Sequence, residues 1–151
     1  MVFQIERERR FLCSELPKNA CRIGAIHQAY LFSSKYLEIR VRAGVMHSAA
    51  LKIGLGGAAR VEIECKILKV IARRIVRTSR FKIEKVRYTI EVVNANGGFS
   101  SWEIDKYLGR HTGLITAERE YAAREKIEIP FWVGDEITGD VKFSNRFLAH
   151  R

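Results

Sequence analysis

The chain has 151 residues, of which 47% are hydrophobic and 29% charged, enough for one domain with a sizeable core but not for two full domains. Its 27 Lys and Arg residues outnumber its 17 Asp and Glu residues, and the formal net charge of +10 favours an anionic partner such as a phosphate-rich ligand or nucleic acid. This composition excludes a disordered polycation, and no apolar run approaches the roughly 20 residues that cross a bilayer.

The N-terminal segment and the cysteines favour a cytoplasmic protein. The segment MVFQIERERR carries charge where a signal peptide has its apolar stretch. Cys13, Cys21 and Cys65 are odd in number and lack Cys-x-x-Cys spacing, so neither a disulfide framework nor a zinc knuckle is indicated. We therefore expect a cytoplasmic protein with reduced thiols and no membrane association.

Strands are predicted wherever apolar and charged residues alternate with a period of two. In chain order, the predicted strands cover residues 5–11, 37–42, 60–65, 81–93, 99–107 and 114–121. The run Asn94-Ala95-Asn96-Gly97-Gly98 supplies the residue types that a hairpin turn requires between two of these strands.

Helical periodicity is confined to a few segments. Between residues 66 and 78, apolar residues recur on one face, which predicts an amphipathic helix. These apolar residues are Ile67, Val70, Ile71 and Ile75. Segment 15–29 is predicted to be a short helix or loop, and Ser144 is predicted to cap a final short helix through Leu148. The predicted fold class is α+β, dominated by antiparallel strands.

Acidic residues occur in four pairs spaced two residues apart, so both members of a pair project from the same side of a strand. The pairs are Glu6/Glu8, Glu62/Glu64, Glu103/Asp105 and Glu118/Glu120. Basic pairs alternate with them along the chain, and Arg10 continues the first acidic face. These basic pairs are Arg40/Arg42 and Lys85/Arg87. Two neighbouring carboxylates repel each other unless a cation lies between them, so the repetition predicts a bound metal ion.

The residue types favour a hard metal ion and a polyphosphate in one site. Mg²⁺ takes oxygen ligands and leaves positions for substrate phosphates, whereas Zn²⁺ more often recruits clustered His or Cys. The histidines, which are His27, His47, His111 and His150, are scattered along the chain. Arg binds phosphate oxygens bidentately and Lys binds them as a point charge, so the basic pairs supply the phosphate contacts.

The alternation leaves two architectures open. If the strands close into a barrel, the charged face lines a wide, wet lumen and the apolar residues pack outward under helices. In a plain sandwich, the same charges form a solvated outer face with salt bridges between strands. The alternation by itself does not decide between the two.

Read in order, these pairs and the segments around them resemble the CYTH superfamily, also called triphosphate tunnel metalloenzymes. The family's Glu-x-Glu-x-Lys signature is similar to Glu6-Arg7-Glu8-Arg9-Arg10, and residues 132–138 read Trp-Val-Gly-x-Glu-x-Thr. Further matching segments are Gln28-Ala29-Tyr30-Leu31, Glu84-Lys85-Val86-Arg87-Tyr88 and Ala117-Glu118-Arg119-Glu120. The resemblance covers nearly the whole chain and implies a single domain, residues 1–151, that forms an eight-stranded antiparallel closed β-barrel with a few outer helices.

The resemblance also implies an activity and a set of site residues. The activity is metal-dependent hydrolysis of the terminal phosphoanhydride of a small triphosphate, most closely inorganic tripolyphosphate, with Mg²⁺ or Mn²⁺ as cofactor. The implied metal ligands are Glu6, Glu8, Glu62, Glu64, Asp105, Glu118 and Glu120. The implied substrate contacts are Arg10, Arg40, Arg42, Lys52, Lys85, Arg87 and Lys142. Tyr30 is a candidate helper of the attacking water.

Arg10 departs from the family pattern, which has Lys at this position. A lysine with a depressed pKa can release its proton and assist water activation, whereas a guanidinium stays protonated. We expect phosphate binding to survive this change. Two outcomes for turnover stay open, a tolerated exchange of one cation for another and impaired catalysis.

Two other functions stay open. An ATP-cyclising adenylate cyclase needs an adenine pocket, which the sequence does not display. A binding module that holds polyphosphate or nucleotide without turnover is compatible with Arg10 and the net charge. We expect a small-molecule triphosphate as the partner rather than nucleic acid, because no aromatic residues interleave the basic residues between 69 and 80, which we interpret as a solvated helix face. A homodimer is left open.

Overall fold

The structure of the protein, a computed structural model, describes residues 2–56, 59–122 and 125–151, and the side chains of residues 7–54, 61–122 and 125–151. Over these residues it has eight β-strands, two α-helices and two short 3₁₀ helices. The strands are β1 (Val2–Leu12), β2 (Cys21–Ser33), β3 (Leu37–Gly44), β4 (Ser48–Gly56), β5 (Ala59–Lys66), β6 (Lys82–Val93), β7 (Phe99–Tyr107) and β8 (Ile115–Glu120). The helices are α1 (Lys69–Thr78), α2 (Asn145–His150), η1 (Gly109–His111) and η2 (Val141–Phe143).

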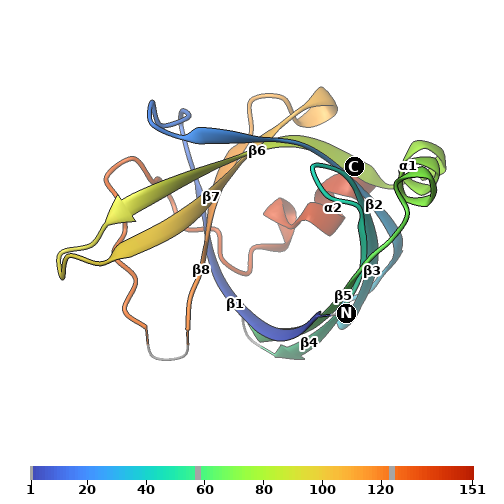
Figure 1. Cartoon of the computed structure of the whole chain (residues 1–151), viewed down its shortest axis with the longest axis horizontal. Coiled ribbons are helices and arrows are strands. Elements are labelled where there is room, and N and C mark those ends of the chain that lie inside the picture. Colours follow the sequence, from blue (N-terminus) through green and yellow to red (C-terminus); the bar gives the residue numbers. More distant parts are fainter. Residues whose placement is uncertain (1, 57–58, 123–124) are drawn as a thin grey trace.

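The strands form one strongly curled antiparallel sheet in the order β1-β5-β4-β3-β2-β6-β7-β8 (Figure 1). Strand β1 pairs with β5 through residues 2–7 and with β8 through residues 8–12, so the two ends of this order share one strand. The predicted α+β class with eight antiparallel strands is confirmed. Helix α1 lies outside the sheet as predicted, whereas α2 lies within its curve (Figure 1). The plain sandwich is excluded by the curl of the sheet and by the pairing of β1 with both β5 and β8.

Apolar side chains pack on the convex, outer face of the sheet. Trp102 and Ile104 on β7 are fully buried beside Phe11 on β1. The Trp102 ring lies 5.7 Å from the ring centroids of Phe11 and Trp132, and Trp132 belongs to the loop that follows β8. This cluster therefore holds the C-terminal loop against the outside of the sheet.

Helix α1 packs on the outer face through a set of residues that only partly matches the predicted one, since Ile67 and Ile75 are partly buried there but Val70 and Ile71 are exposed. Its buried side chains are Ala72 and Val76, which rest on Ala29 and Val41 of β2 and β3. Val70 is 75% exposed, although the periodicity placed it on the buried face. Small side chains such as Ala29 and Ala72 let the helix lie close to the sheet. The buried face of α1 is therefore the side that carries Ala72 and Val76.

Two other segment predictions had different outcomes. Segment 15–29 is not helical from residue 21 onward, because β2 starts at Cys21 and pairs with β3 on one side and β6 on the other. The C-terminal prediction is confirmed, since the Ser144 side chain accepts a hydrogen bond from the Phe147 N–H at 3.3 Å and α2 follows. Helix α1 begins at Lys69, with Leu68 still in an extended conformation.

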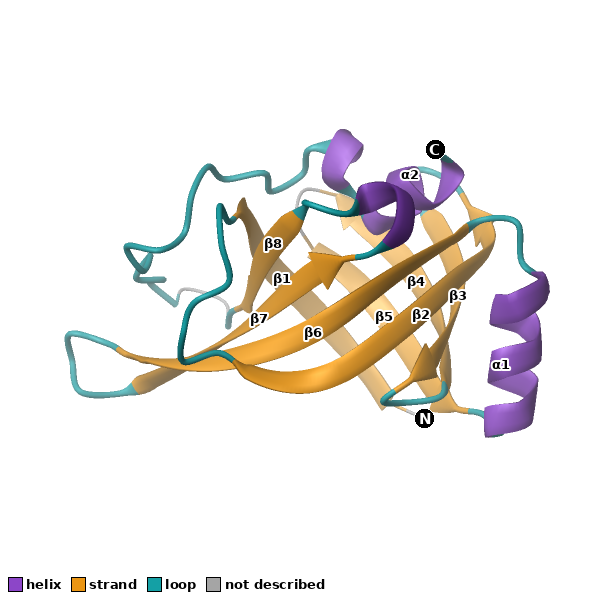
Figure 2. Ribbon diagram, turned by 90° about the horizontal axis from the view of Figure 1, so that it is seen from above, coloured by secondary structure: helices purple, strands orange, loops and turns teal. Residues whose placement is uncertain are grey.

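Helix α2 lies within the curve of the sheet in Figure 1 and over one end of it in Figure 2. Its Leu148 and Ala149 pack against Tyr30, Ile83 and Tyr107, which come from three different strands. Among the elements that the structure describes, no helix has the length and apolar character needed to span a membrane.

Candidate active site

The concave face of the sheet carries a set of charged side chains that we call the lumen cluster. Its members are Arg10, Arg40, Arg42, Lys52, Glu62, Glu64, Lys85, Arg87, Glu103, Asp105 and Glu118. They alternate along their strands with the apolar residues of the outer face. The strand register sets opposite charges side by side, since Arg10 faces Glu118, Lys52 faces Glu62 and Arg87 faces Asp105.

Asp105 lies at the centre of one half of the lumen cluster and is fully buried. The guanidinium of Arg87 donates two hydrogen bonds to it, at 2.8 Å to Oδ1 and 2.7 Å to Oδ2, and Lys85 Nζ also donates to Oδ2. Burial alone disfavours the carboxylate, but the two cations outweigh it and hold the pKa of Asp105 well below its usual range. Asp105 is therefore ionised at every physiological pH.

Lys85 is fully buried and has the most perturbed ammonium group of the described residues. Burial lowers its pKa to about 8, and the neighbouring charge of Arg87 adds to the effect, while Asp105 opposes it. Lys85 is thus the cation of the lumen cluster that is nearest to releasing a proton around neutral pH.

Arg10 connects three elements on the concave face. Its Nε lies 2.9 Å from Glu118 Oε1 on β8, and its Nη2 donates to Tyr107 Oη on β7 at 2.6 Å and to Asn145 Oδ1 on α2 at 3.1 Å. Burial works to lower its pKa, but the charges of Glu118 and its neighbours raise that pKa above the ordinary arginine value. Arg10 is therefore a permanent cation and holds α2 next to the lumen cluster.

The other half of the lumen cluster is built around Glu62, which is 2% exposed. Arg40 Nη2 lies 2.5 Å from Glu62 Oε1, and Lys52 Nζ lies 2.6 Å from Oε2. Glu64 accepts a hydrogen bond from Ser48 Oγ at 2.6 Å and lies 3.9 Å from Arg42 Nη1. Each carboxylate in this half thus lies beside a cation from another strand.

Tyr30 lies at the end of the concave face that α2 covers. It is 3% exposed, packs with Ile83 and Leu148, and accepts a hydrogen bond from the side-chain amide of Gln28. Burial raises the pKa of its phenol well above the usual tyrosine value. Tyr30 therefore stays protonated and can donate a hydrogen bond, but it does not act as a base near neutral pH.

Some of the predicted site residues lie apart from the lumen cluster. Lys142 is exposed on η2, and Glu120 is exposed at the end of β8 opposite the half-buried Glu8 on β1. The side chain of Glu6 lies outside the described residues. Within the described parts of the chain, no three His, Cys, Asp or Glu side chains are gathered into a preformed metal site.

Some members of the site are not among the residues that the resemblance implies. Glu103 pairs with Arg87, faces Glu118 across the strands, and has a pKa raised by burial. The spacing of the acidic residues already pairs it with Asp105, although the implied metal ligands leave it out. Tyr107 and Asn145 gave no signal in the sequence, because they contact Arg10 from segments 97 and 135 residues away.

Comparison with known proteins finds relatives over almost the whole chain. No model of a protein family matches it. An inorganic triphosphatase of Acetivibrio thermocellus is 32% identical over 149 residues, which cover 95% of this chain and 92% of that protein. An inorganic triphosphatase of Nitrosomonas europaea is 27% identical over 150 residues, which cover 95% and 96% of the two chains.

The fold also has a counterpart among solved structures. A crystal structure of an inorganic triphosphatase superposes with a TM-score of 0.69 at 24% identity, covering 96% of this chain and 97% of that one. A crystal structure of a protein described as hypothetical gives the same TM-score at 25% identity. The curled sheet is therefore an arrangement that this chain shares with them.

Proposed function

This chain belongs to the CYTH superfamily of triphosphate tunnel enzymes, and we propose that it hydrolyses the terminal phosphoanhydride of a small triphosphate, most closely inorganic tripolyphosphate. The observation that carries the proposal is the lumen cluster, in which cations and carboxylates from different strands alternate on one concave face. Relatives with the name inorganic triphosphatase match it over 95% of its length.

The proposal includes a closed barrel with a continuous lumen and one functional domain over residues 1–151. The pairing of β1 with both β5 and β8 supports the closure. It also includes a cytoplasmic location, which the free thiols of Cys13, Cys21 and Cys65 support.

The lumen cluster is neutralised internally, and this determines how ligands enter. Arg40 and Lys52 share Glu62, and Lys85 and Arg87 share Asp105. A triphosphate draws these cations onto its oxygens and leaves the carboxylates without partners. A buried, unpaired carboxylate is costly, so a divalent cation must enter with the triphosphate to neutralise it. The triphosphate thus becomes the partner of the cations, and the divalent cation becomes the partner of the carboxylates.

The donor set fits a hard divalent metal ion. The released groups are carboxylate oxygens, which are the ligands that Mg²⁺ and Mn²⁺ prefer. We propose Glu6, Glu8, Glu62, Glu64, Asp105, Glu118 and Glu120 as the residues that hold it, and we add Glu103 from its position beside Glu118. When bound, such an ion activates water and neutralises charge on the transferred phosphoryl group.

The cations of the chain position the substrate. We propose that Arg10, Arg40, Arg42, Lys52, Lys85 and Arg87 bind the phosphoryl oxygens, with Lys142 as a further contact from η2. Fixed cations stabilise the charge of the transition state, and the loss of one such contact lowers kcat by a factor of roughly 10²–10³. Tyr30 donates a hydrogen bond near the attacking water and Lys85 is the group best suited to hold or release a proton.

One observation favours a second candidate, a binding module without turnover. Arg10 is fixed by Glu118, Tyr107 and Asn145 as a permanent cation, so it cannot exchange a proton with the water. If that exchange is required, the lumen cluster binds triphosphate without hydrolysing it.

Phosphate release separates these functions. The purified protein is given tripolyphosphate, ATP or thiamine triphosphate with Mg²⁺ or Mn²⁺, and both phosphate and cyclic AMP are measured. We expect fastest release from tripolyphosphate, its loss with a chelator, and a drop of roughly 10²–10³ in kcat for Arg40→Gln. Arg74→Gln on the exposed face of α1 is the matched control and should be unchanged. Tight binding without release would establish the binding module, and cyclic AMP would establish a cyclase.

A further inference from the structure

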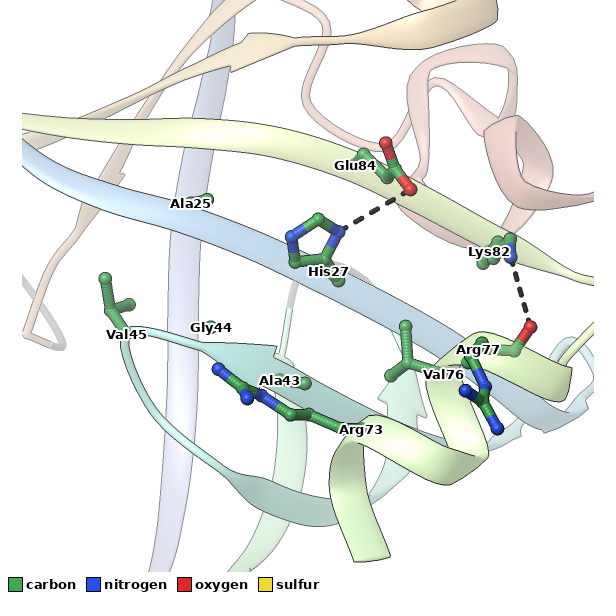
Figure 3. Close-up of a pocket in the computed structure, with 10 residues that line it drawn as sticks. All are labelled: Ala25, His27, Ala43, Gly44, Val45, Arg73, Val76, Arg77, Lys82 and Glu84. Carbon is green, nitrogen blue, oxygen red and sulfur yellow. Dashed lines mark hydrogen bonds and ion pairs between the residues drawn. The ribbon is translucent and has the colours of Figure 1, made fainter. Parts of the chain in front are cut away.

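A cavity opens on the outer face of the sheet, between α1 and strands β2, β3 and β6 (Figure 3). Its volume is about 560 Å³, a size typical of small-molecule sites. The residues that line it are Ala25, His27, Ala43, Gly44, Val45, Arg73, Val76, Arg77, Lys82 and Glu84. We call this cavity the α1 pocket.

The α1 pocket is separate from the lumen cluster, although both use the same strands. Successive side chains of a strand point to opposite faces of the sheet. His27 and Glu84 therefore face the α1 pocket, while their chain neighbours Gln28 and Lys85 belong to the buried concave face. A ligand in the α1 pocket occupies a site that the triphosphate proposal does not use.

The floor of the α1 pocket is apolar and held in place by the backbone. Val45 forms one wall, and its N–H donates to the carbonyl of Ala25 at 3.1 Å. This close approach requires glycine at two positions. Gly44 has φ +134°, and a Cβ there would lie 2.0 Å from the Ala25 carbonyl oxygen, while a Cβ on Gly24 would lie 2.4 Å from Val45 Cγ1. The wall is thus a built feature of the β2–β3 hairpin.

The rim of the α1 pocket is cationic. Arg73 and Arg77 lie four residues apart on α1, so they project to the same side of the helix, and both are exposed. Figure 3 shows the Arg73 guanidinium pointing toward Ala43 and Gly44. Lys82 Nζ donates to the Arg77 carbonyl at 3.4 Å, which keeps a third positive charge beside them.

This positive charge is not balanced within the pocket. Over the described side chains, neither Arg73 nor Arg77 forms an ion pair. Glu84 is the one acidic residue of the lining, and its Oε1 lies 3.5 Å from His27 Nδ1 on the opposite side. The lining thus combines exposed cations, one of which lies over Ala43 and Gly44 (Figure 3), with apolar side chains, and it suits a ligand that has both an anionic and an apolar part.

We propose that the α1 pocket binds a phosphate monoester that carries a flat ring with apolar faces and a polar edge, the chemistry of a nucleoside monophosphate. Guanidinium groups bind phosphate oxygens bidentately, and the exposed side chains of Arg73 and Arg77 are available to a dianion from the two sides of the pocket (Figure 3). The ring lies against Ala25 and the exposed side chain of Val45, and the His27–Glu84 pair offers hydrogen bonds to its polar edge. A triphosphate is not required, so AMP is the suitable probe.

Calorimetric titration with AMP in the presence of a chelator tests the site while leaving metal-dependent chemistry in the lumen cluster silent. We expect saturable binding by the native chain and a loss of at least about tenfold in affinity for the double variant Arg73→Ala/Arg77→Ala. Arg74→Ala is the matched control, because Arg74 is exposed on the same helix but does not line the pocket. Ribose 5-phosphate, which lacks the ring, should bind more weakly than AMP.

Several results would overturn the proposal. They are no AMP binding at millimolar concentration, an equal loss of affinity in Arg74→Ala, or equal binding of ribose 5-phosphate and AMP. Binding of a single-stranded RNA through Arg73 and Arg77 without AMP binding would assign the surface to nucleic acid instead. Tripolyphosphate hydrolysis of the double variant should equal that of the native chain, so the outcome is independent of the proposed activity.

Discussion

The lumen cluster and the rim of the α1 pocket both contain arginine and lysine side chains, but these differ in burial and in partners. In the lumen cluster, Lys85 and Arg40 are buried and contact carboxylates of other strands. On α1, Arg73 and Arg77 are exposed and form no ion pair with any described residue. Water solvates the exposed cations, whereas a buried cation without a partner is costly. A cation in the lumen therefore binds an anion only by exchanging one partner for another.

The largest effect is expected when the partner of two buried cations is removed. In Asp105→Asn, Lys85 and Arg87 lose their shared carboxylate, and we expect the free energy of unfolding to fall by about 3–5 kcal/mol. Urea denaturation measures it. Tripolyphosphate should restore part of the loss because its oxygens replace the carboxylate.

The matched control is Glu125→Gln, which removes the half-exposed partner of Arg119. We expect a loss below about 1 kcal/mol there, since water screens the pair. Equal losses in the two variants would mean that the Asp105 carboxylate contributes no more to the free energy of unfolding than an exposed ion pair does.

The second test adds ligands to the native chain. Tripolyphosphate and Mg²⁺ together should raise the melting temperature by more than the sum of their separate effects, because each supplies the partners that the other displaces. At a hundredfold excess over Kd, the stabilisation is about 2.7 kcal/mol. Differential scanning fluorimetry with each ligand alone and with both measures it. Strictly additive shifts would contradict the exchange of partners.

The third test concerns Arg10 and asks whether a side chain that can release a proton at this position increases turnover. Arg10→Lys should raise kcat severalfold with little change in KM, because both side chains bind phosphate but only lysine can release a proton near neutral pH. Steady-state kinetics on tripolyphosphate measure it. An equal or lower kcat would show that Arg10 only binds phosphate and positions α2 through Asn145.

The smallest effect is expected at an exposed pair outside the lumen. Arg9 donates to Glu136 and lowers the pKa of that carboxyl to about 2. A lowered pKa means that the pair stabilises the fold above about pH 4.5 and loses this contribution as the pH falls toward 2. Glu136→Gln should cost less than about 1 kcal/mol at pH 7 and nothing at the acidic limit, measured by urea denaturation at both pH values. A large loss at pH 7 would place this pair with the buried ones.

The local patterns of the sequence were sufficient for most strands and for the chemistry of the concave face. Alternation predicted the strands that became β6, β7 and β8, and the hydroxyl of Ser144 predicted the start of α2. The charged pairs at 40/42, 62/64, 85/87 and 103/105 each lie on the concave face, because a strand places residues two apart on one side whatever its neighbours are. Glu8 and Glu120 lie apart from the lumen cluster.

The tertiary structure decided the features that depend on distant segments. Period-two alternation says that Arg10 and Glu118 share a face, but only the pairing of β1 with β8 sets them opposite each other. The buried side of α1 likewise follows from the small residues that β2 and β3 present to it, and Val70 is exposed in spite of its place in the helical pattern. The contacts of Tyr107 and Asn145 with Arg10 also depend on how segments far apart in the chain pack together. Periodicity is a property of one strand or helix, whereas register and curvature arise from the hydrogen bonds and packing between elements, and these contacts decide which partner each charge receives.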